Sequence, residues 1–181
     1  MVFVVRTMCI LMFCSMCSCS ESQNRRQHER GSNVPLETLI QRNKKIVGEE
    51  QKKIEKYVKD KKLAMNRTET GLWYSILNEG AGDNIVKGKI VTLNYSVRLL
   101  DESLLYSSDE TGTKEFLVGQ GGVETGLEEG ILMLKNGSKA FFILPSHLAH
   151  GLIGDNDKIK SREILLYEVE VIEVKRYISN E

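Results

Sequence analysis

The chain has 181 residues, of which 41% are hydrophobic and 28% are charged, so it can form one domain with a core plus extensions. Its 25 basic and 25 acidic side chains balance, so overall charge provides no attraction for nucleic acid or an anionic membrane surface. We therefore expect a globular protein with no nucleic-acid partner.

All the cysteines lie at the start of the chain, at Cys9, Cys14, Cys17 and Cys19. The domain that follows is therefore expected to fold without disulfides. Residues 1–18 contain a short basic start at Arg6, an apolar run and then small residues, which is typical of a secretory signal peptide. The apolar run is shorter than the roughly 20 residues that a membrane-spanning helix needs, so we expect no permanent transmembrane helix.

The end of this segment resembles the bacterial lipobox, in which a cysteine is acylated and becomes the mature N-terminus. Small Ser18 makes Cys19 the expected lipidation site, because Cys17 follows a bulky residue; plain secretion is the alternative. Ser20 stands where an aspartate would resemble an inner-membrane retention signal. We therefore expect an outer-membrane lipoprotein of the cell envelope that faces the periplasm, anchored to the membrane by its acyl chains. Polar residues 19–33 would form a flexible tether.

Residues 34–66 are expected to form a charged helix. Pro35 suits the start of a helix, and Gly48 interrupts it at a cost of about 1 kcal/mol relative to alanine. Apolar residues recur at roughly helical spacing at Leu36, Leu39, Ile40, Ile46, Ile54, Tyr57 and Val58. This apolar stripe is thin, so three arrangements stay open: the helix lies on the domain, pairs with a copy of itself in a homodimer, or stands solvated as a spacer.

From residue 67 to residue 181 the pattern indicates one domain. Apolar and polar residues alternate as in strands over 72–77, 90–100, 138–144 and 163–175. Leu127, Ile131 and Leu134 recur at helical spacing, so they predict a short helix between the strands at 90–100 and 138–144. The fold class is therefore α+β, with an antiparallel half-barrel sheet of about five strands wrapped on one short helix.

Several short motifs lie along this domain. They are Gly71-Leu-Trp-Tyr, Val91-Thr-Leu-Asn-Tyr95, Phe116-Leu-Val-Gly119, Gly126-Leu-Glu-Glu-Gly130, Leu148-Ala-His-Gly151 and Leu166-Tyr-Glu-Val-Glu170. Together with the order of the elements, they resemble the FKBP family of peptidyl-prolyl cis-trans isomerases and imply an FKBP-like fold. The upstream segment, with Arg25-Arg26 and residues 39–45, more narrowly resembles the gliding-motility-associated FKBP-type lipoproteins of gliding bacteria.

The glycine-rich stretch between residues 119 and 126 does not indicate a nucleotide. Gly119-Gln-Gly121 is followed by Glu124, so its spacing does not fit a dinucleotide-binding loop. His147 and His150 lie three residues apart, but no cysteine is near them, so we expect no metal site. We therefore expect neither cofactor nor metal.

The resemblance implies a pocket that holds a proline ring. The residues that would line it are Tyr95, Leu105, Tyr106, Phe116, Val123, Glu124, Leu127, His150, Ile159 and Tyr167. Isomerisation of an Xaa-Pro bond must cross a barrier of about 18–20 kcal/mol set by amide resonance, and it requires no proton or nucleophile. Apolar walls and a few hydrogen-bond donors are sufficient, because the twisted amide loses charge separation and suffers less from leaving water.

Tyr95 and Phe116 match the family's pattern, and many of the other positions depart from it. Leu127 stands where a tryptophan often forms the pocket floor, His150 where a tyrosine hydroxyl would hold the substrate carbonyl, and Tyr106 where an aspartate is usual. Leu105 replaces an aromatic residue, Glu124 an apolar residue that supplies a main-chain donor, and Tyr167 a phenylalanine. Leucine recovers only part of the burial that an indole provides, so we expect weak activity.

These residues leave two main functional hypotheses. The protein is an isomerase that acts on proline-containing segments of envelope proteins, or it is a non-catalytic binding subunit or chaperone of an envelope or motility machinery. The matching aromatic residues and the largely apolar pocket favour the first hypothesis, whereas the losses at Tyr106, Leu127 and His150 favour the second. A third reading treats the helix as a structural spacer and the domain as its passive cargo.

Overall fold

The structure is a computed structural model that describes residues 35–177. The predicted signal peptide, Cys19 and the tether lie outside the described residues. The chain divides into two compact units, residues 1–40 and 41–181, and the description below concerns the second unit. In the described part of the chain, no helix is both long and apolar enough to cross a membrane.

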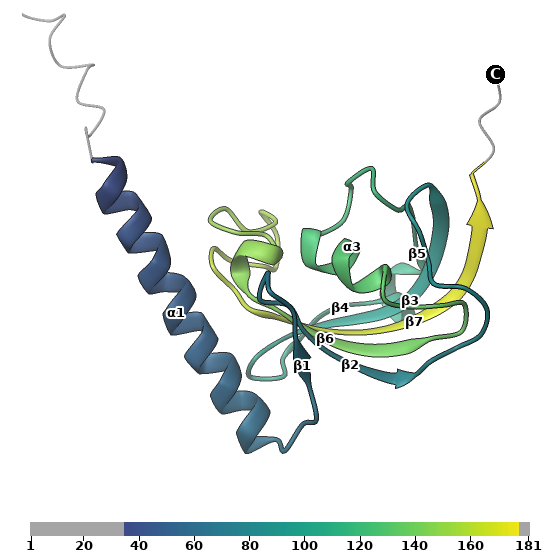
Figure 1. The fold of residues 1–181 in the computed structure, drawn as a ribbon, viewed down its shortest axis with the longest axis horizontal. Coiled ribbons are helices and arrows are strands. Elements are labelled where there is room, and N and C mark those ends of the chain that lie inside the picture. The colour runs from purple at the N-terminus through teal and green to yellow at the C-terminus, as the bar shows by residue number, and fades with distance from the viewer. Residues whose placement is uncertain (1–34, 178–181) are drawn as a thin grey trace, which may run out of the picture. The chain divides into compact units, whose positions relative to one another are not determined.

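An antiparallel sheet forms the centre of this unit (Figure 1). Its strands are β1 (Asn66–Arg67), β2 (Trp73–Asn78), β3 (Lys89–Leu99), β4 (Leu104–Ser107), β5 (Lys114–Leu117), β6 (Lys139–Leu144) and β7 (Leu165–Arg176). The order is β1-β2-β6-β7-β3-β4, and β5 pairs with one end of β3. The two longest strands, β3 and β7, pair from Lys89↔Arg176 to Leu99↔Leu165 inside the sheet.

The concave face of the sheet wraps around α3 (Thr125–Ile131), as Figure 1 shows. Leu127 and Ile131 are fully buried there against the same cluster as Phe142 of β6. Two glycines permit this close approach, because a Cβ added at Gly130 would lie 2.7 Å from Phe142 Cζ, and one added at Gly126 would lie 2.7 Å from Leu144 Cγ. The helix thus fills the half-barrel.

The predicted α+β class, with an antiparallel sheet around a short helix, is confirmed. The expectation of about five strands is too low, since the described residues form seven. The strands for which the sequence indicated no range, β1, β4 and β5, have only two to four residues each, and alternation over so few positions does not identify a strand. The predicted helical spacing extends to Leu134, but α3 ends at Ile131 and the chain continues in tighter turns, with Leu134 N donating to Ile131 O at 3.0 Å.

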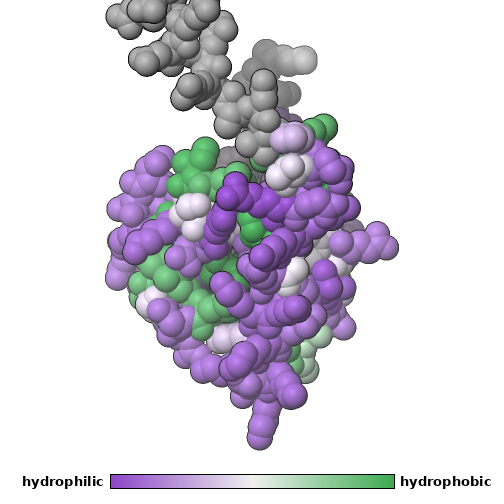
Figure 2. Space-filling view, turned by 90° about the vertical axis from the view of Figure 1, so that its left-hand side faces the viewer, coloured by the Kyte–Doolittle hydropathy of each residue, from purple (hydrophilic) through white to green (hydrophobic). Residues whose placement is uncertain are grey.

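The second half of the N-terminal helix, α1 (Leu36–Asp60), lies on the outer face of the sheet. Ile54 is fully buried in a cluster with Ile143, Ile164 and Leu166, and Tyr57 packs against the same cluster. Within residues 41–60 this is the first of the three arrangements left open by the sequence. The remaining side chains of the helix are mostly charged and exposed, and the face turned to the viewer in Figure 2 is largely hydrophilic.

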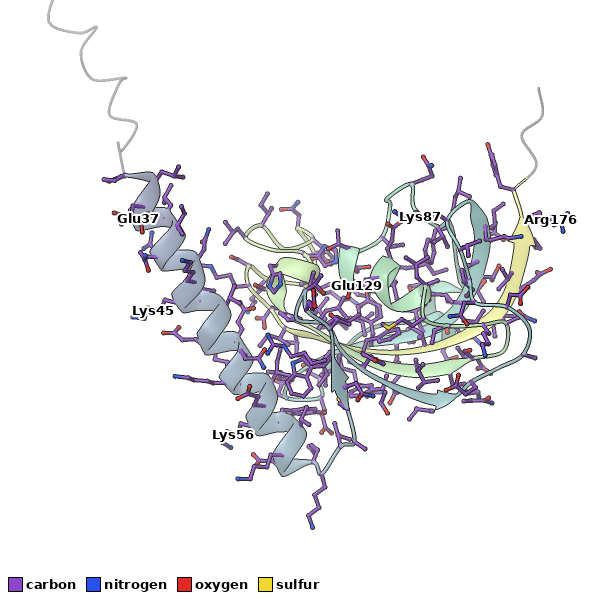
Figure 3. The ribbon with its side chains drawn as sticks, viewed as in Figure 1. Glu37, Lys45, Lys56, Lys87, Glu129 and Arg176 are labelled. Carbon is purple, nitrogen blue, oxygen red and sulfur yellow. The ribbon has the colours of Figure 1, made fainter. Side chains whose placement is uncertain are left out.

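A buried carboxylate joins α1 to the loop between β6 and β7. Glu50 is 5% exposed, and its Oε1 and Oε2 accept hydrogen bonds from Ser146 Oγ at 2.7 Å and Ser146 N at 3.0 Å. Ser146 begins the short 3-10 helix η1 (Ser146–Leu148). Another carboxylate, that of Glu129 on α3, points toward the loop between β1 and β2, where Thr70 Oγ1 lies 2.7–2.8 Å from both of its oxygens (Figure 3). Side-chain contacts of this kind fix the loops around α3.

Candidate functional site

The sequence-predicted pocket residues come together beside α3. Eight of them belong to one hydrophobic cluster, namely Tyr95, Leu105, Tyr106, Phe116, Val123, Leu127, Ile159 and Tyr167. Phe116, Leu127, Ile159 and Tyr167 are buried, and the other four are partly exposed. Glu124 and His150 join the group through hydrogen bonds described below. The predicted pocket residues therefore form one group, in which buried apolar side chains lie beside partly exposed ones.

Each wall of this site comes from a different element. Tyr95 lies on β3, Leu105 and Tyr106 on β4, Phe116 on β5 and Tyr167 on β7. Val123 and Glu124 precede α3 and Leu127 lies on it, whereas His150 and Ile159 belong to the long loop between β6 and β7. Strand alternation directs Tyr95 and Tyr167 to the concave face, where their Cα positions are two apart in the β3–β7 register.

The carboxylate of Glu124 lies among the pocket residues. Its side chain is only 6% exposed, and Oε1 accepts hydrogen bonds from the Tyr167 hydroxyl and from His150 Nε2, the latter at 2.9 Å. Oε2 is buried and accepts no hydrogen bond from any residue in the described range 35–177. Where the resemblance implied an apolar side chain, the structure thus has a buried acid.

Burial and charge act in opposite directions on this acid. Burial has the largest influence and raises the pKa of Glu124, but the Lys114 ammonium, the Tyr167 hydroxyl, the residue's own main-chain N–H and His150 together hold that pKa below its ordinary value. Conversely, burial and the adjacent Glu124 raise the pKa of the Tyr167 hydroxyl well above its ordinary value. At neutral pH the pair is therefore a carboxylate that accepts from a neutral phenol.

The phenol of Tyr106 connects β4 to the β6–β7 loop through hydrogen bonds. The Tyr106 hydroxyl donates to Asp155 and lies 3.1 Å from Asp157 Oδ2, and Lys158 Nζ donates to Leu105 O at 2.8 Å. Burial, together with the Asp155 carboxylate, raises the pKa of Tyr106 to about 12. Tyr106 occupies the position where the resemblance implied an aspartate, and the loop now supplies the acidic partner. Nothing in the spacing of the sequence indicated this contact.

The rim of the pocket is polar around Tyr95. Its hydroxyl lies 2.8 Å from Thr111 Oγ1, and its main-chain N–H donates to Ser108 Oγ at 3.2 Å. The Lys114 ammonium lies 5.1 Å from the centre of the Tyr95 ring, which is within the range of a cation–π interaction. Sequence reasoning missed Lys114, because a lysine at the start of a four-residue strand has no local signal for such a position.

The two histidines that the sequence places three residues apart do not share a partner. His147 is exposed and its Nε2 lies 3.0 Å from Thr70 O, whereas His150 bonds to Glu124. Across residues 35–177, no group of three or more histidine, cysteine, aspartate or glutamate side chains is arranged to hold a metal ion. A hollow of about 460 Å³ is lined by Asn94, Glu168 and other residues that include the polar face of the sheet, and Tyr95 is the one predicted pocket residue that borders it. Its lining offers no set of aromatic residues.

Replacing Glu124 with glutamine is expected to make the free energy of unfolding depend less on pH between pH 7 and pH 3. Because the pKa of Glu124 is held below its ordinary value near 4.5, its ionised form stabilises the folded state above that value. This stabilisation is lost as the pH falls through the lower, folded-state pKa. Urea unfolding of both proteins at pH 7 and at pH 3 measures the effect, and the difference in unfolding free energy should be smaller at pH 3. A difference independent of pH contradicts the assignment.

Residues 82–172 match the protein family described as "FKBP-type peptidyl-prolyl cis-trans isomerase". The chain is 35% identical over 114 residues to a probable FKBP-type peptidyl-prolyl cis-trans isomerase FkpA of Neisseria meningitidis serogroup B, a match that covers 62% of this chain and 41% of that protein. It is 33% identical over 122 residues to the FKBP-type 22 kDa peptidyl-prolyl cis-trans isomerase of Escherichia coli, covering 66% of this chain and 58% of that protein.

The crystal structure of FkpA from Escherichia coli is similar to this fold, with a TM-score of 0.63 and 28% sequence identity. The similarity covers 77% of this chain and 65% of that one. The chain spans about half the length of the curated relatives that it matches, between 41% and 58% of four of them. The family match over residues 82–172 contains all ten of the predicted pocket residues.

Proposed function

The chain belongs to the FKBP-type peptidyl-prolyl cis-trans isomerases, and from that premise we propose that its pocket accelerates, weakly, the isomerisation of Xaa-Pro bonds in proteins of the cell envelope. The observation that carries the proposal is the convergence of Tyr95, Phe116 and Tyr167 over the buried Leu127, within one apolar cluster. Such a site can bury a proline ring and exclude water from the amide that twists.

The low rate follows from the polar groups inside this pocket and from its smaller floor. Leu127 offers less contact area to a proline ring than the indole that the family's pattern often places there. The Glu124 carboxylate adds charge where the pattern has an apolar side chain, and its contact with His150 occupies the imidazole nitrogen that would otherwise donate to a substrate carbonyl. Both changes weaken binding of the transition state.

We also propose that the protein acts in the envelope as a lipoprotein acylated at Cys19, with residues 19–33 as the tether. The support is the signal-peptide pattern and the small residue before Cys19 in the sequence. Labelling of the expressed protein with a radioactive fatty acid tests the anchor. Incorporation should be lost in Cys19→Ala and retained in Cys17→Ala; unchanged labelling of Cys19→Ala overturns the assignment of this cysteine.

The decisive assay of the isomerase follows the cis-to-trans relaxation of a short Xaa-Pro peptide with and without the purified protein. We expect relaxation faster than the uncatalysed reaction, which takes tens of seconds or more. No acceleration at micromolar protein overturns the isomerase proposal. The buried carboxylate in the pocket favours a second candidate, a binding subunit or chaperone without turnover, and peptide binding without acceleration would select it.

A further inference from the structure

Buried and partly buried carboxylates in this domain differ in how completely they are hydrogen-bonded. Both oxygens of Glu50 accept bonds from Ser146, and Asp155 accepts from the Tyr106 hydroxyl and from the main-chain N–H groups of Asp157 and Ile159. These two carboxylates are fully used in joining segments of the fold. Glu124 is different, since Tyr167 and His150 both bond to Oε1 and leave the buried Oε2 without a donor in the described chain.

An ionised oxygen of this kind is unfavourable inside a protein unless a donor or a positive charge reaches it. The only other buried side-chain atom without a partner in residues 35–177 is Trp73 Nε1, a donor in the cluster that faces α1, which cannot satisfy an acid in the pocket from there. The fold has therefore placed an acceptor among the pocket residues and has not supplied its donor. A ligand that reaches this oxygen would supply a donor, as a bound water molecule would.

The charges around the pocket indicate what kind of donor fits. Glu124, Asp155 and Asp157 contribute three carboxylates, whereas the nearby ammonium groups are those of Lys114 and Lys158. Lys114 lies over the Tyr95 ring and its charge already acts on Glu124, and Lys158 donates to Leu105 O. A further positive charge would therefore meet a net negative site, and a charged donor bonds to a carboxylate about twice as strongly as a neutral one does.

We propose that Glu124 is a specificity-determining residue that makes this pocket prefer proline segments in which lysine or arginine precedes the proline. The inference rests on the proposed function, because the Xaa-Pro bond in the pocket is what brings the side chain of Xaa to the pocket wall. The long, flexible stem of lysine or arginine packs along the apolar side chains of the pocket while its charged end reaches Glu124. A main-chain N–H of the peptide would satisfy Glu124 equally in every sequence and would give no such preference.

The test compares peptides that differ only at Xaa: lysine, arginine, norleucine and glutamate. Norleucine has nearly the length of lysine without its charge. We expect a kcat/KM for Lys-Pro about fivefold above that for norleucine-Pro, and the lowest value for Glu-Pro. In Glu124→Gln the ratio of the first two should fall to about one, because the amide keeps the shape and loses the charge.

Glu168→Gln is the matched control, since Glu168 follows Tyr167 on β7 but is exposed on the opposite face, where Ser96 Oγ donates to it at 3.3 Å. This variant removes one negative charge near the site and should keep the fivefold ratio. If Glu168→Gln abolishes the preference as Glu124→Gln does, the preference is a general effect of surface charge and the inference is overturned.

Titration of the same peptides into isotope-labelled protein, followed by NMR, separates this inference from the proposed function. If no peptide is isomerised but Lys-Pro binds about fivefold more tightly than norleucine-Pro, the isomerase is rejected and the specificity stands. Equal affinities for these two peptides in the unmodified protein overturn the specificity, whether or not the bond is isomerised. This comparison needs no variant, so a misfolded Glu124→Gln does not prevent the decision.

Discussion

Replacing Ile54 with alanine is expected to lower the free energy of unfolding by about 2–5 kcal/mol, the usual cost of emptying a buried isoleucine site. Ile54 is fully buried between α1 and the outer face of the sheet, in contact with the cluster of Ile143, Ile164 and Leu166. The change removes apolar contacts and leaves a cavity that a helix fixed at Glu50 closes only in part. Urea unfolding followed by the fluorescence of Trp73 measures the loss.

Val47→Ala is the matched control on the same helix. Val47 is 40% exposed and belongs to neither hydrophobic cluster, so its truncation should change the unfolding free energy by no more than about 0.5 kcal/mol. If both variants are equally stable, the helix is a solvated spacer and does not pack on the domain. If Ile54→Ala alone is destabilised, residues 41–60 are part of the folded unit.

The helix also shows which of its contacts could be predicted from the sequence and which could not. The apolar spacing identified Ile54, Tyr57 and Val58 correctly as one face of a helix, since periodicity is a local property. It could not identify Glu50, which has the composition of a solvated position. Its partner Ser146 lies 96 positions along the chain, and only the fold brings the two together.

The long strands were predictable for the same reason. Residues 90–100 and 163–175 alternate over more than ten positions, and β3 and β7 begin and end within two residues of those limits. The four-residue strands β4 and β5 were not resolved as strands from alternation, because their pairing with β3 supplies the stability that their own sequences lack. Pairing with a neighbouring strand therefore determines whether a segment as short as β4 or β5 forms a strand.

In the site, the resemblance predicted which residues converge but not how they contact one another. Tyr95 and Tyr167 sit on the long strands β3 and β7, so their direction followed from alternation, whereas Phe116 lies on the short strand β5. The bonds from Tyr106 to Asp155 and from His150 to Glu124 depend on the path of the β6–β7 loop, which has no periodic signal. The loop is held at Ser146, His150 and Asp155, so the part of the pocket that was least predictable is fixed by side-chain hydrogen bonds.

Enlarging the pocket floor should raise the activity. Leu127→Trp restores the indole that the family's pattern often places on this helix, and the added contact area with a proline ring is expected to increase kcat/KM about tenfold. The larger side chain must also fit beside Phe116 and Tyr167, so we expect the unfolding free energy to fall by about 1–3 kcal/mol. Rates should therefore be measured well below the unfolding temperature of the variant.

Ile131→Trp separates the effect on the floor from the effect of overpacking. Ile131 lies four residues further along α3, is also fully buried in the same cluster, and is not a pocket residue. It should destabilise the protein to a similar extent without increasing kcat/KM. A folded Leu127→Trp protein that is no faster than the unmodified one would show that the small floor is not what limits turnover. In that case the polar contacts of Glu124 with His150 and Tyr167 would be the remaining cause of slow catalysis.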